Sequence, residues 1–407
     1  MWIVFCKKKF INKILGKKII ITILSFMPIF LSAQNAIVKE MISLISEDSI
    51  YKNVKELEDF QTRFSFAKNN KKIADYLAIR LTNYGFETKI DSFYIENCPV
   101  WKDSLFFEGW QYNVVSVKRS NRSTDKDYSL FLGAHYDCIS NMDGFKDYMH
   151  FAPGADDNAS GVACLLELAR IWNNYWKDEQ YNLRIEFYCN EEQGLCGSDA
   201  RLKQLSSNCQ IHPFAMINLD MVGYDTTNTV SLNYYDGCDH LTELARKNTL
   251  LYTDLNVNLT QEIIERSDSW VFYTWGFDAL FISENDFSPY YHTLQDSSIY
   301  LNYSYMKKIT ALTLATSYEL LNDYKAVSIE NVEREETKIY NDSEKLYIHL
   351  NEKIPAKIVL YNVNGNIIYK QFTNKQYTTI PISDFEQGLY IVNIITIDNK
   401  FIRRFIK

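Results

Sequence analysis

Apolar and polar positions along the chain form blocks that predict helices and strands in alternation. Between residues 35 and 90 apolar side chains such as Ile73 and Leu77 recur at helical spacing, and Gly85 ends the pattern. A further helix is predicted to begin near Ser160. Buried or alternating apolar runs predict strands at Thr88–Tyr94, Tyr112–Lys118, Tyr128–Gly133, Arg184–Tyr188, Pro213–Leu219 and Asp278–Ser283. This alternation predicts an α/β fold with a mostly parallel twisted sheet flanked by helices.

The pattern changes near residue 325. A charge-rich stretch at 326–338 is typical of a linker, and beyond it short alternating strands are separated by turns such as Asn364-Gly365. The predicted strands are Lys345–Leu350, Lys357–Tyr361, Ile367–Phe372, Leu389–Ile395 and Lys400–Ile406. We therefore expect a small all-β sandwich over 339–407, after an α/β domain over 34–325.

The first 33 residues have the layout of a secretory signal peptide. Six lysines precede an apolar run, Ile19–Leu31, and small residues follow at Ser32-Ala33. The apolar run is short for a bilayer span and is interrupted by Pro28, which favours cleavage over the alternative, an N-terminal membrane anchor. We expect no stable membrane span once this segment has been removed.

Charge and cysteine usage narrow the classes of function. The formal net charge is −8, and because six of the 43 basic residues lie in the predicted signal peptide, 37 remain against 51 acidic residues. Such an acidic chain is unsuited to binding nucleic acid, which requires clustered cations. Of the eight cysteines, Cys6 lies in the signal peptide, and the other seven match no zinc-finger spacing. The sequence does not decide whether a disulfide such as Cys209–Cys238 forms.

Imidazole and carboxylate side chains occur at or near the ends of the predicted strands. The candidate metal ligands are His135, Asp156, Glu192, Asp220 and His292, and Glu191 lies beside one of them. Ligands of parallel α/β sheets bind beyond the carboxyl ends of the strands, so we expect these groups to converge. Two zinc ions about 3.5–4 Å apart can activate one water and polarise a carbonyl. The charge of three carboxylates and one hydroxide would balance two Zn²⁺. The other histidines, His150, His212, His240 and His349, are expected to be structural or solvated.

Five ordered motifs carry a resemblance that covers residues 35–325. They are Gly133–Asp137 (GAHYD), Pro153–Val162 (PGADDNASGV), Asn190–Ser198 (NEEQGLCGS), Asn218–Gly223 (NLDMVG) and Tyr291–Asp296 (YHTLQD). Together they resemble the M28 family of zinc aminopeptidases, of the bacterial leucyl aminopeptidase type. The resemblance implies a zinc exopeptidase fold, two Zn²⁺ as cofactors, and peptide or protein N-termini as substrates.

The resemblance also implies a role for each candidate residue. Asp156 would bridge the two zinc ions, and the peptide bond after the bridging aspartate, here Asp156–Asp157, would be cis. Glu191 would be the general base for a zinc-activated water, and Asp137 would orient His135. The metal sites are completed by His135 with Asp220 and by Glu192 with His292.

The chain departs from the family pattern at Ser269, where a histidine is common, so the substrate pocket is the part of the site in doubt. Aromatic residues that could line the pocket, or equally pack in the core, are Trp270, Phe272, Tyr273, Tyr290 and Tyr291. Two other functions are weighed. A glutaminyl-peptide cyclotransferase shares the fold but typically works with one zinc. A non-catalytic binding protein on the same fold would lack some of the metal ligands, and none of the five is missing here.

The end of the chain carries a second resemblance. Lys357–Gly365 (KIVLYNVNG), Gly388–Val392 (GLYIV) and the basic end Arg403–Lys407 are similar to the C-terminal sorting domain of type IX secretion. The usual Asn-Pro near the start of that domain is missing, and Tyr340–Asp342 stands there instead. A generic binding sandwich is the alternative. The resemblance implies the type IX machinery as a partner, and a secreted or surface-attached protein that passes through the periplasm.

Overall fold

A computed structural model describes residues 34–407, except 101–103, 123–126, 143, 145–146, 178, 208–210, 323–337, 342–343, 351–354 and 397–399. The predicted signal peptide and nearly all of the predicted linker lie outside the described residues, so these boundaries stay predictions. Within the described part of the chain, no helix has the length and apolar character needed to cross a bilayer.

The predicted helical region near the N-terminus forms α1 (Ala36–Ser43), α2 (Glu47–Glu58) and α3 (Asn70–Asn83). Helix α2 shows why these segments are helical, because Ser46 caps its first turn by accepting from the Ser49 N–H, and its apolar side chains are buried on one face. Helix α3 ends just before Gly85, which adopts a φ of 75° that glycine favours.

An eight-stranded sheet lies at the centre of this domain, with the strand order β1-β2-β4-β3-β5-β8-β6-β7. Strands β4, β3, β5 and β8 are mutually parallel, as are β6 and β7, whereas β1, β2 and the β6–β8 pair are antiparallel. The strands are β1 (Glu87–Pro99), β2 (Phe106–Val117), β3 (Asp127–His135), β4 (Asn182–Tyr188), β5 (Ile211–Leu219), β6 (Thr229–Tyr234), β7 (Asn256–Thr260) and β8 (Asp278–Glu284). The predicted mostly parallel sheet is confirmed.

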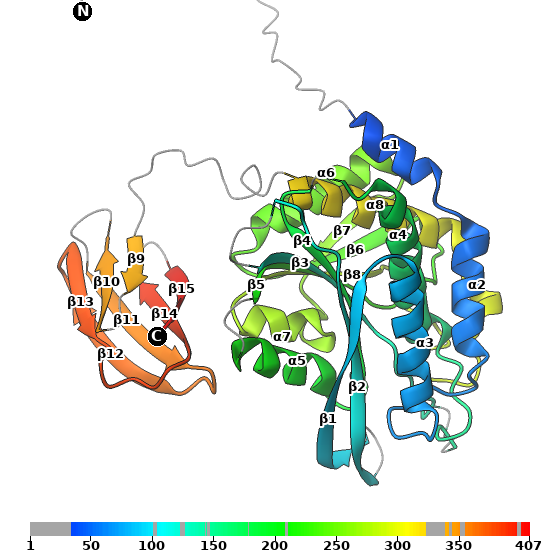
Figure 1. Ribbon diagram of the computed structural model, residues 1–407, viewed down its shortest axis with the longest axis horizontal. Helices are drawn as coiled ribbons and strands as arrows, with labels where there is room; N and C mark the ends of the chain where they lie inside the picture. Colours follow the sequence, from blue (N-terminus) through cyan, green and yellow to red (C-terminus); the bar gives the residue numbers. More distant parts are fainter. Residues whose placement is uncertain are drawn as a thin grey trace, which may run out of the picture. The chain divides into compact units, whose positions relative to one another are not determined.

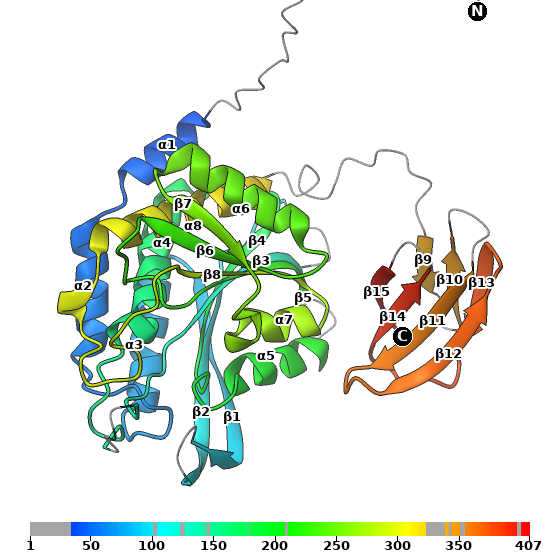
Figure 2. The same ribbon diagram turned by 180° about the vertical axis from the view of Figure 1, so that it is seen from behind.

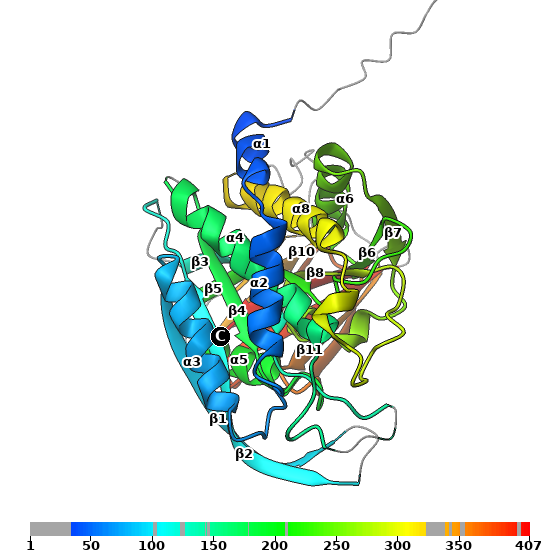
Figure 3. The same ribbon diagram turned by 90° about the vertical axis from the view of Figure 1, so that its right-hand side faces the viewer.

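Helices cover both faces of the sheet (Figures 1 and 2). One face carries α3, α4 (Gly161–Tyr175), α6 (Asp239–Tyr252) and α8 (Tyr303–Asn322), with α1 and α2 packed outside them, and Figure 3 looks onto this face. The other face carries α5 (Cys196–Ser207) and α7 (Ser269–Thr274). A large apolar core fills the first interface, and a smaller one around Phe131 and Phe272 fills the second.

All six strands predicted before residue 325 are present, and α4 begins one residue after Ser160. The pattern did not predict β6 and β7. Strand β7 exposes or half-exposes all of its residues at the sheet edge, so burial imposes little pattern on it. Strand β3 contains an apolar run because both of its faces are covered, whereas β4 alternates apolar residues with the buried Arg184 and Glu186.

The C-terminal domain consists of two antiparallel sheets, with the strand orders β13-β10-β9 and β12-β11-β14-β15. Its strands are β9 (Lys338–Asn341), β10 (Lys345–His349), β11 (Ala356–Asn362), β12 (Ile367–Thr373), β13 (Tyr377–Pro381), β14 (Leu389–Ile395) and β15 (Lys400–Ile406). Side chains from both sheets, among them Ile348, Leu360 and Val392, share one apolar core. The predicted small β sandwich is confirmed, with β9 and β13 in addition to the five predicted strands.

Candidate metal centre

Four parallel strands bring most of the predicted ligands to one edge of the sheet. His135 is the last residue of β3, and Asp220 directly follows β5. Glu192 lies in the loop after β4, and His292 lies in the loop after β8. Because these strands run in the same direction, their carboxyl ends meet at the same edge, as the sequence predicted.

Two groups of potential ligands meet at a shared carboxylate. One consists of His135, Asp157 and Asp220, the other of Asp157, Glu192 and His292, and within each group the ligand atoms lie within 4.8 Å of one another. His135 Nε2 lies 3.1 Å from both Asp157 Oδ1 and Asp220 Oδ1. His292 Nε2 lies 3.0 Å from Asp157 Oδ2 and 2.8 Å from Glu192 Oε2. Asp157 therefore presents one oxygen to each group.

The residue shared by the two groups is Asp157, whereas Asp156, which was predicted to bridge the ions, belongs to neither group. Asp156 Oδ1 accepts a hydrogen bond from the Gly223 N–H at 2.9 Å. The cis peptide bond is likewise one residue later than predicted, between Asp157 and Asn158. The backbone at both Asp157 and Asn158 is non-helical, so the adjacent carboxylates point in different directions. Spacing in the sequence could not decide between two adjacent aspartates.

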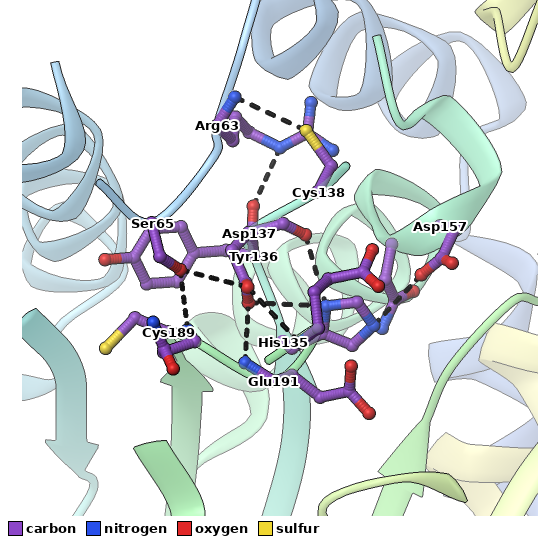
Figure 4. A network of polar contacts seen from close by, with 12 residues as sticks. Arg63, Ser65, His135, Tyr136, Asp137, Cys138, Asp157, Cys189 and Glu191 are labelled. Carbon is purple, nitrogen blue, oxygen red and sulfur yellow. Dashed lines mark hydrogen bonds and ion pairs between the residues drawn. The ribbon is translucent and has the colours of Figure 1, made fainter. Parts of the chain in front are cut away.

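Asp137 connects His135 with the loop that carries Glu191. Its backbone oxygen lies 3.2 Å from His135 Nδ1, and its Oδ1 lies 3.6 Å from the same nitrogen. Its carboxylate also accepts hydrogen bonds from the Glu191 N–H at 3.1 Å and from the Ser65 hydroxyl at 3.0 Å. Figure 4 shows the His135 imidazole with Asp157 at one ring nitrogen and Asp137 at the other. A single buried carboxylate thus holds both an imidazole and the backbone of the loop that carries Glu191.

Two further polar residues, which the sequence did not assign a role, hold the loop that carries Asp157. The Asp296 carboxylate accepts from the Asp156 N–H at 2.7 Å and from the Asp157 N–H at 3.1 Å. The buried Arg63 guanidinium donates to the backbone oxygens of Pro153 and Gly154 at 2.7 and 2.5 Å (Figure 4 shows Arg63 above the site). Asp296 is the last residue of the fifth motif, and this was the only feature of the sequence that could have pointed to it. Arg63 lies in no motif, so no such feature pointed to Arg63.

The site crowds carboxylates into a buried volume, and this shifts their pKa values. Burial raises the pKa of Glu191 well above its ordinary value and that of Glu192 to about 7. Burial lowers the pKa of His292, but the negative charge of Glu192 and hydrogen bonds outweigh it and raise that pKa to about 10. Burial also acts to raise the pKa of Asp157, yet hydrogen bonds from His135 and His292 bring it below the usual range. The cluster keeps protons on some members because it cannot hold so many bare negative charges.

These residues fit divalent zinc. Imidazole nitrogens and carboxylate oxygens are ordinary zinc ligands, and each group supplies three of them. Glu192 Oε1 is buried and has no hydrogen-bond partner among the described residues, which leaves it available as a ligand atom. Cations would replace the protons that the cluster otherwise retains. Neither His150, His240 nor His349 belongs to such a group in the described part of the chain.

A cavity of about 620 Å³ opens onto the two groups. Asp157, Glu192, Asp220 and His292 line it, as does Glu191. Its other walls are Pro99, Gln193, Gly194, Leu195, Met221, Ile263, Arg266, Phe281, Ser283, Glu284, Phe287 and Tyr291. The cavity thus combines a polar floor with a largely apolar wall.

Of the aromatic residues that were candidates for this pocket, only Tyr291 is among those lining it. Phe272 is buried in the core between α7 and the sheet, and Trp270 and Tyr273 pack against that core. Ser269 is fully buried, and its hydroxyl lies 2.9 Å from the Tyr235 hydroxyl. The departure at Ser269 therefore does not change the wall of the cavity, contrary to expectation.

Comparison with known proteins agrees with this geometry. Residues 113–317 match the family described as Peptidase family M28, and residues 342–407 match the Secretion system C-terminal sorting domain. A probable zinc metalloprotease of Pyrenophora teres f. teres is 28% identical over 70% of the chain and 66% of its own length. A leucine aminopeptidase 1 of Ajellomyces dermatitidis is 28% identical over 70% of the chain and 73% of its own length. The chain thus spans slightly less than two thirds of the first of these relatives.

Solved structures share the fold. LapB from Legionella pneumophila superposes with a TM-score of 0.59 at 24% identity, over 71% of this chain and 76% of LapB. BSAP, a zinc aminopeptidase from Bacillus subtilis, has a TM-score of 0.58 at 16% identity, over 69% of this chain and 96% of its own. Porphyromonas gingivalis glutaminyl cyclase has a TM-score of 0.53 at 21% identity, over 68% and 99%. At these identities the likeness concerns the fold alone.

Proposed function

Because the chain belongs to peptidase family M28, we propose that it is a zinc-dependent aminopeptidase that removes N-terminal residues from peptides with two zinc ions. The observation that carries the proposal is the position of Asp157, whose two oxygens face two separate groups of ligands. A carboxylate shared in this way suits a pair of ions better than a single one.

The five ligands would divide between the two ions. His135 and Asp220 would hold one, Glu192 and His292 the other, and Asp157 both. Zinc, when bound, supplies Lewis acidity, which polarises the scissile carbonyl and lowers the pKa of water. Three carboxylates offset most of the charge of two divalent ions, which supports this division.

Glu191 would act as the general base. Its carboxylate lines the cavity but belongs to neither ligand group, so it is available to accept a proton from the attacking water. It would then donate that proton to the departing amine, as one residue acting first as base and then as acid. Its backbone is held by the Asp137 carboxylate, which would fix the position of the base relative to His135.

The sorting domain supports export. The match to a secretion system C-terminal sorting domain indicates an extracellular or cell-surface protein. We propose that the chain crosses the inner membrane by its signal peptide and the periplasm on its way to the type IX machinery. Peptides outside the cell would then be its substrates.

The test is a panel of aminoacyl-chromophore substrates, assayed on the purified protein together with metal analysis. We expect release of the N-terminal residue, about two zinc ions per chain, and loss of activity with a chelator. Release of no residue together with cyclisation of N-terminal glutamine would instead favour a glutaminyl cyclase, a fold relative of which is known.

The role of Glu191 is tested with Glu191→Gln, which keeps the shape of the side chain but cannot accept a proton. Loss of a general base typically costs about 10²–10⁴-fold in rate. We therefore expect a kcat lower by that factor with unchanged zinc content, while Glu262→Gln, at an exposed position, stays at the wild-type rate. A near-normal kcat in Glu191→Gln would remove this residue from the mechanism.

A further inference from the structure

Two cysteines far apart in the sequence meet beside the cavity. Cys98 lies near the end of β1, and Cys196 is the first residue of α5. Their thiols hydrogen-bond to one another. Both also contact Asn190, because Cys98 Sγ lies 3.5 Å from Asn190 Oδ1 and the Cys196 N–H donates to the Asn190 oxygen at 3.0 Å.

The backbone around this pair is held in place by other contacts. Gly197 lies so close to the end of β4 that a Cβ there would stand 2.1 Å from the Cys189 oxygen. The Asn113 side chain donates to the Gly197 oxygen at 2.8 Å and accepts from the Cys189 N–H at 3.1 Å. The start of α5 is therefore fixed against β2, which is paired with β1, the strand that carries Cys98.

Cys98 differs in its pKa from two other buried thiols, those of Cys138 and Cys164. Burial raises the pKa of Cys138 and of Cys164 to about 12, which makes both unreactive. The hydrogen bond between the two thiols instead lowers the pKa of Cys98, and together with burial it raises the pKa of Cys196. Cys98 is buried, whereas Cys196 is partly exposed, so an oxidant can reach one member of the pair.

We propose that Cys98 and Cys196 form a disulfide in the exported protein, and that this bond ties together two walls of the cavity. Pro99 follows Cys98 and lines the cavity from one side, and Gln193–Leu195, directly before Cys196, line it from another. The bond forms by exchange with a donor disulfide, carried by an oxidoreductase or a small-molecule thiol. One of the two cysteine thiolates attacks the donor disulfide and displaces one donor thiol, the other attacks the resulting mixed disulfide and displaces the second, and the donor leaves as two reduced thiols.

The chemical test is peptide mapping of the exported full-length protein, alkylated without reduction and analysed by mass spectrometry. The expected result is one linked species that contains Cys98 and Cys196 and is lost on reduction, while Cys138 and Cys164 stay unlinked. Alkylation of both Cys98 and Cys196 in the exported protein, or their linkage to other cysteines, would overturn the proposal. This measurement requires no peptidase activity, so its result is independent of the proposed function.

The consequence for the cavity rests on the proposed function and is measured through KM. We expect a phosphine reductant to raise the KM of the wild-type enzyme at least threefold with little change in kcat, because the cavity walls loosen. The Cys196→Ser variant should show the raised KM without reductant and no further response to it, which controls for effects of the reductant elsewhere. A linked wild-type enzyme whose KM does not respond to reduction would refute the role of the bond in shaping the cavity.

Discussion

The loop that carries Asp157 depends on a buried cation, Arg63, that has no acidic partner among the described residues. The Arg63 guanidinium is 1% exposed and donates to four backbone oxygens, those of Leu57, Tyr136, Pro153 and Gly154. A side chain at Gly154 would collide with it, since a Cβ there would lie 2.7 Å from the Arg63 Nη2. Arg63→Met keeps most of the apolar volume and removes every donor, so it isolates the contribution of these hydrogen bonds.

The expected loss in the free energy of unfolding depends on which backbone oxygens lose their only hydrogen-bond donor. The oxygens of Leu57 and Gly154 also accept from other backbone N–H groups. Those of Tyr136 and Pro153 accept from Arg63 alone among the hydrogen bonds between described residues. Two buried acceptors left without a partner cost about 2–6 kcal/mol. Methionine avoids the cost of burying a cation, so the lower half of that range, about 3 kcal/mol, is the expected loss.

Thermal unfolding with a chelator present measures this loss without a contribution from metal. For a domain of this size, about 3 kcal/mol corresponds to a Tm lower by roughly 6–12 °C. The matched control is Arg246→Met on α6, because Arg246 is partly exposed and, among the described residues, its only ion-pair partner is Glu243 three residues away. Such a surface pair contributes at most about 1 kcal/mol. A Tm for Arg63→Met as close to wild type as that of Arg246→Met would refute the reasoning.

Two further predictions concern the metal centre. Asp157→Asn should abolish stoichiometric zinc binding, whereas Asp156→Asn, which loses only an indirect contact, should lower zinc affinity by about 100-fold at most; equilibrium dialysis with metal analysis separates them, and equal losses would count against Asp157 as the shared ligand. Zinc binding should also release protons, because Glu192, with a pKa of about 7, and His292, with a pKa of about 10, are largely protonated at pH 6 in the metal-free protein. Calorimetry in buffers of different ionisation enthalpy should therefore show release of about one to two protons at pH 6 and an affinity that rises with pH, and a pH-independent affinity would contradict this.

Local patterns in the sequence were sufficient for the central strands and for the order of the motifs. Strands such as β3 and β8 are buried on both faces over most of their length, so their apolar runs are easily recognised. His135 is the last residue of one central strand, Glu192 and Asp220 lie after the ends of two others, and parallel strands place their carboxyl ends together. The convergence of these groups could therefore be predicted before any coordinates were known.

The sequence by itself determined the α/β fold, the C-terminal sandwich and the neighbourhood of the metal centre, because hydrophobic periodicity and strand direction are local properties. Only the tertiary structure decided between Asp156 and Asp157, since the direction of each carboxylate depends on a backbone held by Arg63 and Asp296. The meeting of Cys98 with Cys196 was likewise decided only in three dimensions. Contacts between residues so far apart along the chain depend on how the sheet and its loops pack, which no local pattern records.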